Sequence, residues 1–154
     1  MTHLRVGNPA PPIVASDQEG NRIDLENFKG EKVVLFFYPK DNTPGCTAEV
    51  CSLRDNYSGL INKGLNIIGI SPDGEKSHQN FIAKFHLPFP LIPDQDKKIL
   101  QAYGVWGEKK MYGKSYMGVL RTTFIIDEEG KIEKIIEKVR TKDHAQQIVE
   151  ELFG

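Results

Sequence analysis

The chain has 154 residues, a length typical of a single domain, and we expect residues 1–154 to form one domain. Its 20 basic and 21 acidic residues are interspersed and give a net charge of −1, which excludes the basic surface that nucleic acid or anionic lipid would require. No apolar segment of signal-peptide length begins the chain, and the longest apolar run, from Val33 to Tyr38, is too short to cross a membrane. These features predict a cytoplasmic protein that contacts neither nucleic acid nor a membrane.

The first predicted elements lead to a buried strand and a helix. Prolines make the first dozen residues extended and irregular, and a polar turn leads to a short strand at 22–25. Residues 33–38 are β-branched and aromatic, which is the composition of a fully buried strand. A helix then begins after Thr43, an acceptable N-cap, with Pro44 at its first position, and it ends at Gly64.

Strands and helices alternate in the middle of the chain. Residues 65–70 have the composition of a second buried strand, and a helix is predicted at 75–85. A short strand at 91–94 and a short helix at 96–103 follow. Four glycines then interrupt the aromatic and basic residues of 104–120, so we expect a mobile loop there. Its large apolar side chains are expected to cover the sheet: Trp106, Met111, Tyr112 and Tyr116.

The last part of the chain predicts a hairpin and a helix. Apolar residues in 122–127 and 131–136 flank a turn that contains Gly130, which is the pattern of a β-hairpin. Residues 143–153 are predicted to form a helix, because apolar residues recur there at helical spacing from Ala145 onward. The order of elements predicts an α/β fold of thioredoxin-like topology, in which a mixed central sheet carries helices on both faces.

Both cysteines of the chain fall in the helix that follows the first buried strand. Cys46 lies in its first turn, where free N–H groups and the positive end of the helix dipole favour a thiolate and lower its pKa. At 100° per residue, Cys46 lies on an apolar stripe and Cys51 lies about 140° away from it. The stripe is formed by Val50, Leu53, Tyr57, Leu60 and Ile61. Residues five apart in an intact helix have Cα atoms ~8.6 Å apart, beyond the ~7 Å limit for a disulfide, so these thiols cannot bond unless the helix opens.

The segment from Pro39 to Cys46 has the spacing Pro, three residues, Thr, two residues, Cys. Together with Cys51 in the same helix, it closely resembles the active-site segment of the peroxiredoxins, and in particular of their Q-type branch, the bacterioferritin comigratory proteins. The similarity covers nearly the whole chain, including residues 69–73 and 121–127.

This resemblance implies a thiol peroxidase that needs no cofactor and no metal. In such an enzyme Cys46 is the peroxidatic cysteine, which hydrogen peroxide or an organic hydroperoxide oxidises to a sulfenic acid. Cys51 is the resolving cysteine, which then forms an intramolecular disulfide, and a thioredoxin-type dithiol reduces that disulfide. We expect the protein to be a monomer.

Five further residues are assigned roles in the site. By the same resemblance, Pro39 is expected to shield the thiolate, Thr43 to orient the peroxide with its hydroxyl, and Arg121 to support the negative charge. Gly45 is expected to let the peroxide approach the backbone and Glu49 to orient Arg121, so both belong to the substrate-binding part of the site. Nothing in the local sequence ties Arg121 to the cysteines, so an ordinary charge at a strand end is an equal alternative for it.

Two other functions remain open. A thiol–disulfide oxidoreductase on the same fold would ordinarily use Cys-x-x-Cys, and the four residues between Cys46 and Cys51 argue against it. A metal-binding or redox-sensing module would need a second cluster of cysteine and histidine ligands, which the sequence lacks. The histidines are scattered and are assigned no role: His3, His78, His86 and His144.

Overall fold

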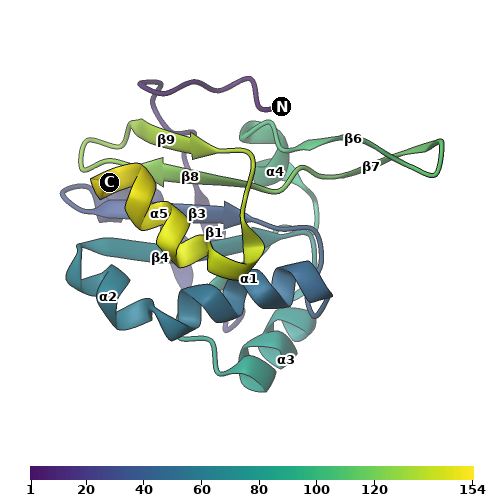
Figure 1. Cartoon of the computed structure of the whole chain (residues 1–154), viewed down its shortest axis with the longest axis horizontal. Coiled ribbons are helices and arrows are strands. Elements are labelled where there is room, and N and C mark those ends of the chain that lie inside the picture. The colour runs from purple at the N-terminus through teal and green to yellow at the C-terminus, as the bar shows by residue number, and fades with distance from the viewer.

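Five strands form the central sheet of the protein, which the structure, a computed structural model, describes over residues 1–154. Across the sheet they are ordered β5 (Leu91–Pro93), β4 (Leu65–Ser71), β3 (Lys32–Phe37), β8 (Thr122–Ile126) and β9 (Ile132–Ile136). Strands β3, β4 and β5 run parallel, whereas β8 is antiparallel to both β3 and β9. The sheet is therefore mixed, as predicted (Figure 1).

The central strand β3 supplies both hydrophobic cores. Because side chains alternate along a strand, Val34 and Phe36 point into the core on one face, while Val33, Leu35 and Phe37 point into the core on the other. All five side chains are buried. This confirms the predicted buried strand and places its C-terminal end in the interior of the molecule.

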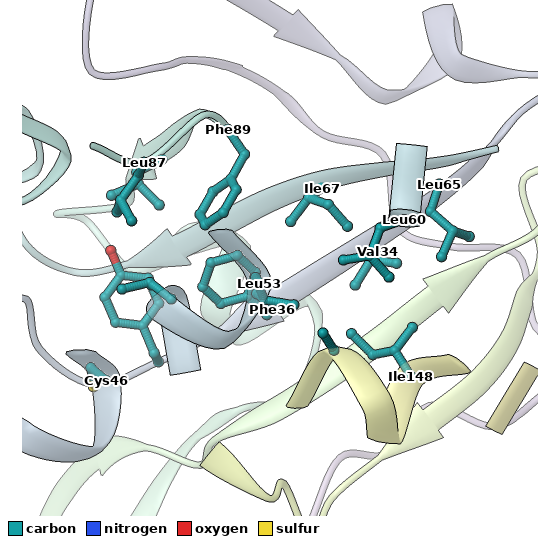
Figure 2. Packing of buried hydrophobic residues seen from close by; sticks show 14 of the residues in the cluster. Val34, Phe36, Cys46, Leu53, Leu60, Leu65, Ile67, Leu87, Phe89 and Ile148 are labelled. Carbon is teal, nitrogen blue, oxygen red and sulfur yellow. The ribbon is translucent and has the colours of Figure 1, made fainter. Parts of the chain in front are cut away.

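Four helices cover one face of the sheet. They are α1 (Pro44–Asp55), α2 (Tyr57–Asn62), α3 (Glu75–Phe85) and α5 (His144–Phe153). Figure 2 shows apolar side chains of α1, α2 and α5 packed against those of β3 and β4, with Cys46 at one edge of the cluster. The bounds of α3 are those predicted, because its apolar residues recur at clear helical spacing.

The other face is covered by shorter elements. They are α4 (Lys98–Ala102), the paired strands β1 (Val14–Ser16) and β2 (Arg22–Asp24), and the 3₁₀ turn η1 (Leu25–Phe28). The predicted helices on both faces are thus confirmed, whereas no strand was predicted at β1, whose last residue, Ser16, begins the predicted polar turn. None of the helices is long and apolar enough to span a membrane.

The predicted cysteine helix is divided in two at Asn56. The side chain of Asn56 donates a hydrogen bond to Ser52 O at 2.8 Å, so it takes the carbonyl that the helical N–H of the same residue would use. Helix α1 ends before this residue and α2 begins after it. Leu60 of the second segment is buried as predicted, whereas Ile61, which was predicted to lie at the edge of the same stripe, is 40% exposed.

A β-hairpin occupies the segment that was predicted to be a mobile loop. Strands β6 (Trp106–Met111) and β7 (Lys114–Val119) pair antiparallel and project from the body of the molecule (Figure 1). Tyr112 and Gly113 join them with φ of 52° and 76°, the left-handed backbone of a two-residue hairpin turn. The prediction was wrong because Gly107 and Gly118, counted as loop signals, are paired within the ladder.

The side chains of this hairpin also differ from the prediction. Tyr112 is 97% exposed, and Met111 and Tyr116 are exposed as well, so they do not cover the sheet. Of the four apolar residues singled out in this segment, Trp106 alone packs against the core, at the base of the hairpin.

Candidate active site

Cys46 lies in the first turn of α1, just beyond the end of the buried strand β3, and is fully buried as predicted. The first hydrogen bond of the helix runs from Thr47 N to Thr43 O at 2.8 Å. The N–H groups of Gly45 and Cys46 precede it and have no partner within the helix. This end of α1 therefore presents N–H donors and a positive potential, both of which stabilise a thiolate.

Thr43 occupies the N-cap position with an extended backbone, as predicted, but its side chain does not cap the helix. Its Oγ1 donates a hydrogen bond to Lys40 O at 2.8 Å, because the turn before α1 presents that carbonyl to the hydroxyl. The expected capping bond is therefore wrong. As a result, the N–H groups of the first turn stay available, and the lone pairs of the hydroxyl oxygen remain free to accept a hydrogen bond.

Arg121 joins the site from the connection between β7 and β8. Its Nη2 lies 3.3 Å from Cys46 Sγ, and its Nη1 lies 2.6 Å from Glu49 Oε1, one turn further along α1. The guanidinium thus bridges the sulfur and the carboxylate, which is the contact that an orienting role for Glu49 requires. No local sequence signal could have tied Arg121 to a cysteine 75 positions earlier.

Burial and charge shift the pKa values of this pair. Burial opposes the charge of Arg121, but the Glu49 carboxylate and the Cys46 thiolate outweigh it and raise the pKa of Arg121 above its ordinary value. Burial raises the pKa of Glu49 to about 7, although Arg121 opposes the rise. Glu49 therefore titrates near neutral pH.

The absence of a side chain at Gly45 makes room for the guanidinium. A Cβ at this position would lie 3.2 Å from Arg121 Nη2, which is tighter than ordinary contact. Glycine thus lets Arg121 sit against the helix N-terminus. This adds a role for Gly45 beside the expected approach of the peroxide to the backbone.

Pro39 and Cys51 flank the first turn. Pro39 is partly buried and follows the last residues of β3, and Cys51 is partly buried in the second half of α1. Both Cys46 and Cys51 are free thiols in the intact helix. The structure is therefore that of the reduced protein, with α1 wound through both cysteines.

Two buried histidines near the site carry no signal of function in the sequence. His78 on α3 places Nδ1 at 2.7 Å from Asp41 Oδ2, and Tyr38 donates its hydroxyl to Asp41 Oδ1 at 2.6 Å. This network holds the segment between β3 and α1. His144, the first residue of α5, has Nε2 3.5 Å from Glu49 Oε2. The sequence could have predicted their burial, however, because each histidine extends the apolar stripe of its helix.

The first of these networks also brings together possible metal ligands. Asp41, Asp73 and His78 lie close enough to share an ion. Each carboxylate, however, already accepts hydrogen bonds. Asp73 accepts them from the Ser71 hydroxyl and from Asp41 N, and Asp41 accepts one from the Ser77 hydroxyl among others. The charges are thus satisfied by the protein's own donors, and the cluster serves as a brace for the loop before α1.

The comparison with protein families decides among the functions that this geometry allows. The model described as the AhpC/TSA family matches residues 6–135. The chain belongs to the AhpC/TSA family. A Bcp protein of Coxiella burnetii is 45% identical over 95% of this chain and 97% of its own, and peroxiredoxin Bcp of Bacillus subtilis is 42% identical over 97% and 95%.

A solved structure gives the same result. The bacterioferritin comigratory protein of Xanthomonas campestris, studied for its alkyl peroxide reduction activity, superposes with a TM-score of 0.88 at 35% identity, covering 99% of this chain and 97% of that one. The thioredoxin-like peroxiredoxin fold and the Bcp, or Q-type, resemblance are confirmed. This peroxiredoxin is a thiol peroxidase, whose family uses a peroxide substrate and a thioredoxin-type reductant.

Proposed function

We propose that Cys46 is the peroxidatic thiol and that Arg121 is the residue that makes it reactive. The observation that carries this assignment is the 3.3 Å contact between Arg121 Nη2 and Cys46 Sγ at the N-terminus of α1. A guanidinium and a helix N-terminus favour the thiolate together, and they lie where negative charge develops on the departing oxygen.

The chemical step uses the groups at the start of α1. The Cys46 thiolate attacks one oxygen of the hydroperoxide, the O–O bond breaks, and the departing oxygen leaves as water or alcohol after it takes up one proton. Thr43 orients the peroxide through its hydroxyl oxygen, Gly45 N–H and Arg121 stabilise the charge on it, and Pro39 screens the sulfur from water. The sulfur is oxidised to a sulfenic acid and the peroxide is reduced.

Cys51 completes the cycle as the resolving cysteine. Its thiolate attacks the sulfenic sulfur, a disulfide forms and the hydroxyl leaves as water. Because the two cysteines are five positions apart in the helix, α1 must unwind between them before the sulfurs can meet. A thioredoxin-type dithiol then reduces the disulfide to two thiols, which lets α1 rewind.

The cycle, the fold and the relatives together support four further properties of the protein. Both cysteines belong to the same chain, so we infer a monomeric enzyme. Its need for a dithiol reductant suits a reducing compartment such as the cytoplasm. The two cores share the strand β3, so residues 1–154 act as one domain. The substrates include hydrogen peroxide and alkyl hydroperoxides, the class named for the relative in Xanthomonas campestris.

Cysteine variants test these assignments. Cys46→Ser should abolish peroxide consumption, whereas Cys51→Ser should consume one equivalent and leave a sulfenic acid that a dimedone-type reagent labels in the intact mass. The oxidised parent should run as a monomer on a non-reducing denaturing gel. Steady turnover by Cys51→Ser with thioredoxin, or a disulfide-linked dimer of the parent, would contradict the resolving role. Insulin reduction without peroxide consumption would instead support a thiol–disulfide oxidoreductase.

A further inference from the structure

One carboxylate oxygen of Glu49 has no hydrogen-bond partner, although the side chain is completely buried. Its Oε1 accepts from Arg121 at 2.6 Å, and the partnerless atom is Oε2. Leaving a buried polar atom unpaired costs about 1–3 kcal/mol, and more when the group is charged. On the side of α5, Nε2 of the buried His144 lies 3.5 Å from Oε2.

Hydrogen bonds fix which nitrogen of His144 carries its hydrogen. Gln147 donates from Nε2 to Lys138 O at 2.9 Å, and Arg140 N donates to Gln147 Oε1 at 2.8 Å, so the orientation of the amide is set. The same Oε1 lies 2.9 Å from His144 Nδ1 and can only accept, so Nδ1 carries the hydrogen. In a neutral ring Nε2 is then an acceptor, and the Thr123 hydroxyl donates to it at 2.8 Å.

The ring is neutral because of its surroundings. Burial lowers the pKa of His144 to about 4, and the charge of Arg121 acts in the same direction. An ionised Glu49 would therefore direct a buried, unpaired negative oxygen at the lone pair of His144 Nε2. A hydrogen on Oε2 removes that charge.

We propose that Glu49 and His144 form a proton-holding pair behind Arg121. Glu49 carries a hydrogen on Oε2, and His144 is a positioning residue whose neutral Nε2, 3.5 Å away and already accepting from Thr123, has no hydrogen to offer an ionised Oε2. In this state Glu49 still accepts Arg121 Nη1 through Oε1 and orients the guanidinium, but does not neutralise it. The full charge of Arg121 then acts on Cys46. This inference rests on the role of Cys46 in the proposed function.

The charged and titratable groups around Glu49 make the consequence specific. They are Cys46 on α1, Arg121 before β8 and His144 on α5, while Asp143 and Arg140 act on His144 from further out. With the proton in place, one thiolate faces one guanidinium. Loss of the proton adds a second negative charge beside the same guanidinium, which weakens its effect on the sulfur and on the departing oxygen.

The pH profile of the first oxidation step tests this pair. The second-order rate constant for oxidation of the reduced protein by hydrogen peroxide should fall as Glu49 ionises above about pH 7, which gives the profile a falling limb. Glu49→Gln cannot ionise and should lose the falling limb, whatever its maximal rate constant. The matched control Glu151→Gln, an exposed carboxylate on α5, should keep it. A falling limb that persists in Glu49→Gln would overturn the proposal.

Infrared spectroscopy tests the same proton without relying on activity. At about pH 6 the reduced protein should show the C=O band of a buried carboxylic acid, which Glu49→Gln removes. In His144→Phe the band should shift, because the polar ring nitrogen 3.5 Å from Oε2 is lost. The absence of any band that Glu49→Gln removes would refute the pair, and a band unmoved in His144→Phe would refute the role of His144. The Glu49→Gln comparison is decisive even if His144→Phe does not fold.

These measurements separate the pair from the function on which it rests. If Cys46 were not the peroxidatic thiol, Cys46→Ser would still react with peroxide at the parent rate, and the infrared band would be unaffected by that result. If Cys46 is the peroxidatic thiol but Glu49 is ionised in the reduced protein, peroxide oxidation depends on Cys46 while both the acid band and the falling limb are missing.

Discussion

The ionisations of Glu49 and His144 change the free energy of unfolding with pH in opposite directions. Substituting one residue should therefore reveal the pH dependence that the other contributes. Burial raises the pKa of Glu49 from 4.5 to about 7, so its contribution to folding stability is fully present below pH 4.5 and is lost as the pH rises to about 7. Burial lowers the pKa of His144 from 6.5 to about 4, so its contribution is present above pH 6.5 and is lost as the pH falls to about 4.

The two effects overlap between pH 4.5 and 6.5. A difference of one bound proton changes the free energy of unfolding by about 1.4 kcal/mol per pH unit, so each residue contributes about 3 kcal/mol over this range, with opposite sign. Relative to the parent, the free energy of unfolding of Glu49→Gln should rise by about 3 kcal/mol from the acid to the neutral end of this range. That of His144→Phe should fall by about the same amount.

Urea unfolding followed by circular dichroism, repeated across this pH range, measures both slopes. The double variant Glu49→Gln/His144→Phe lacks both groups and should recover the pH dependence of the parent, as should the surface control Glu151→Gln. If the two single variants follow the parent at every pH, neither group has a shifted pKa. The reasoning from burial would then be refuted for both.

Two further predictions concern the guanidinium. Arg121→Gln removes the charged donor 3.3 Å from Cys46 Sγ and should lower the rate constant for peroxide oxidation roughly 10²–10³-fold in stopped-flow measurements, and an unchanged rate would remove Arg121 from the site. Gly45→Ala brings a Cβ to 3.2 Å from Arg121 Nη2 and should cost up to about 10²-fold by displacing it, whereas Gly59→Ala, where a Cβ meets nothing within 4 Å, should not change the rate.

Local sequence patterns were enough to predict most of the sheet and the position of Cys46. The hairpin of β8 and β9 and the helix α3 follow from strand and helix periodicity alone. The burial of Cys46 follows from its place on an apolar stripe at a helix start. These features depend on interactions between residues close in the chain, which is why they can be read without the tertiary structure.

The errors arise where one residue type is compatible with two local structures. Glycine signals a loop, but Gly107 and Gly118 face each other across the β6–β7 ladder, and Gly113 shares the left-handed backbone of the turn with Tyr112. A threonine before a helix signals a side-chain cap, but Thr43 bonds to Lys40 O instead. In each case the contacts with the partner strand or with neighbouring residues decide which structure forms.

The approach of Arg121 to Glu49 was expected from the family resemblance alone, and the arrival of His144 beside them could not have been predicted, because these residues come from the β7–β8 connection, α1 and α5. A histidine on the apolar stripe of a helix is also uninformative by itself, since a buried structural histidine and a functional one can occupy the same position. What distinguishes His144 is the unpaired Oε2 of Glu49 opposite its Nε2, which exists only in the folded chain.

In the proposed cycle the same residues would link the opening of α1 to a proton. Glu49 lies between Cys46 and Cys51, so the unwinding proposed for the disulfide step would withdraw Glu49 from Arg121 and His144. Beyond this segment α1 stays anchored, because Ser52 Oγ accepts the N–H of Ala145 at 3.1 Å and Arg54 donates to Phe85 O at 2.9 Å.

Once Glu49 reaches water, its pKa returns from about 7 to the ordinary value of 4.5. At pH 7 Glu49 is about half protonated in the wound helix and ionised in the open one, so opening would release about half a proton. By linkage, the wound form is favoured at low pH and the open form at higher pH, until Glu49 is ionised in both. Burial thus keeps Glu49 uncharged while the peroxide is attacked. The ionisation of Glu49 would then favour the unwinding that the proposed disulfide requires.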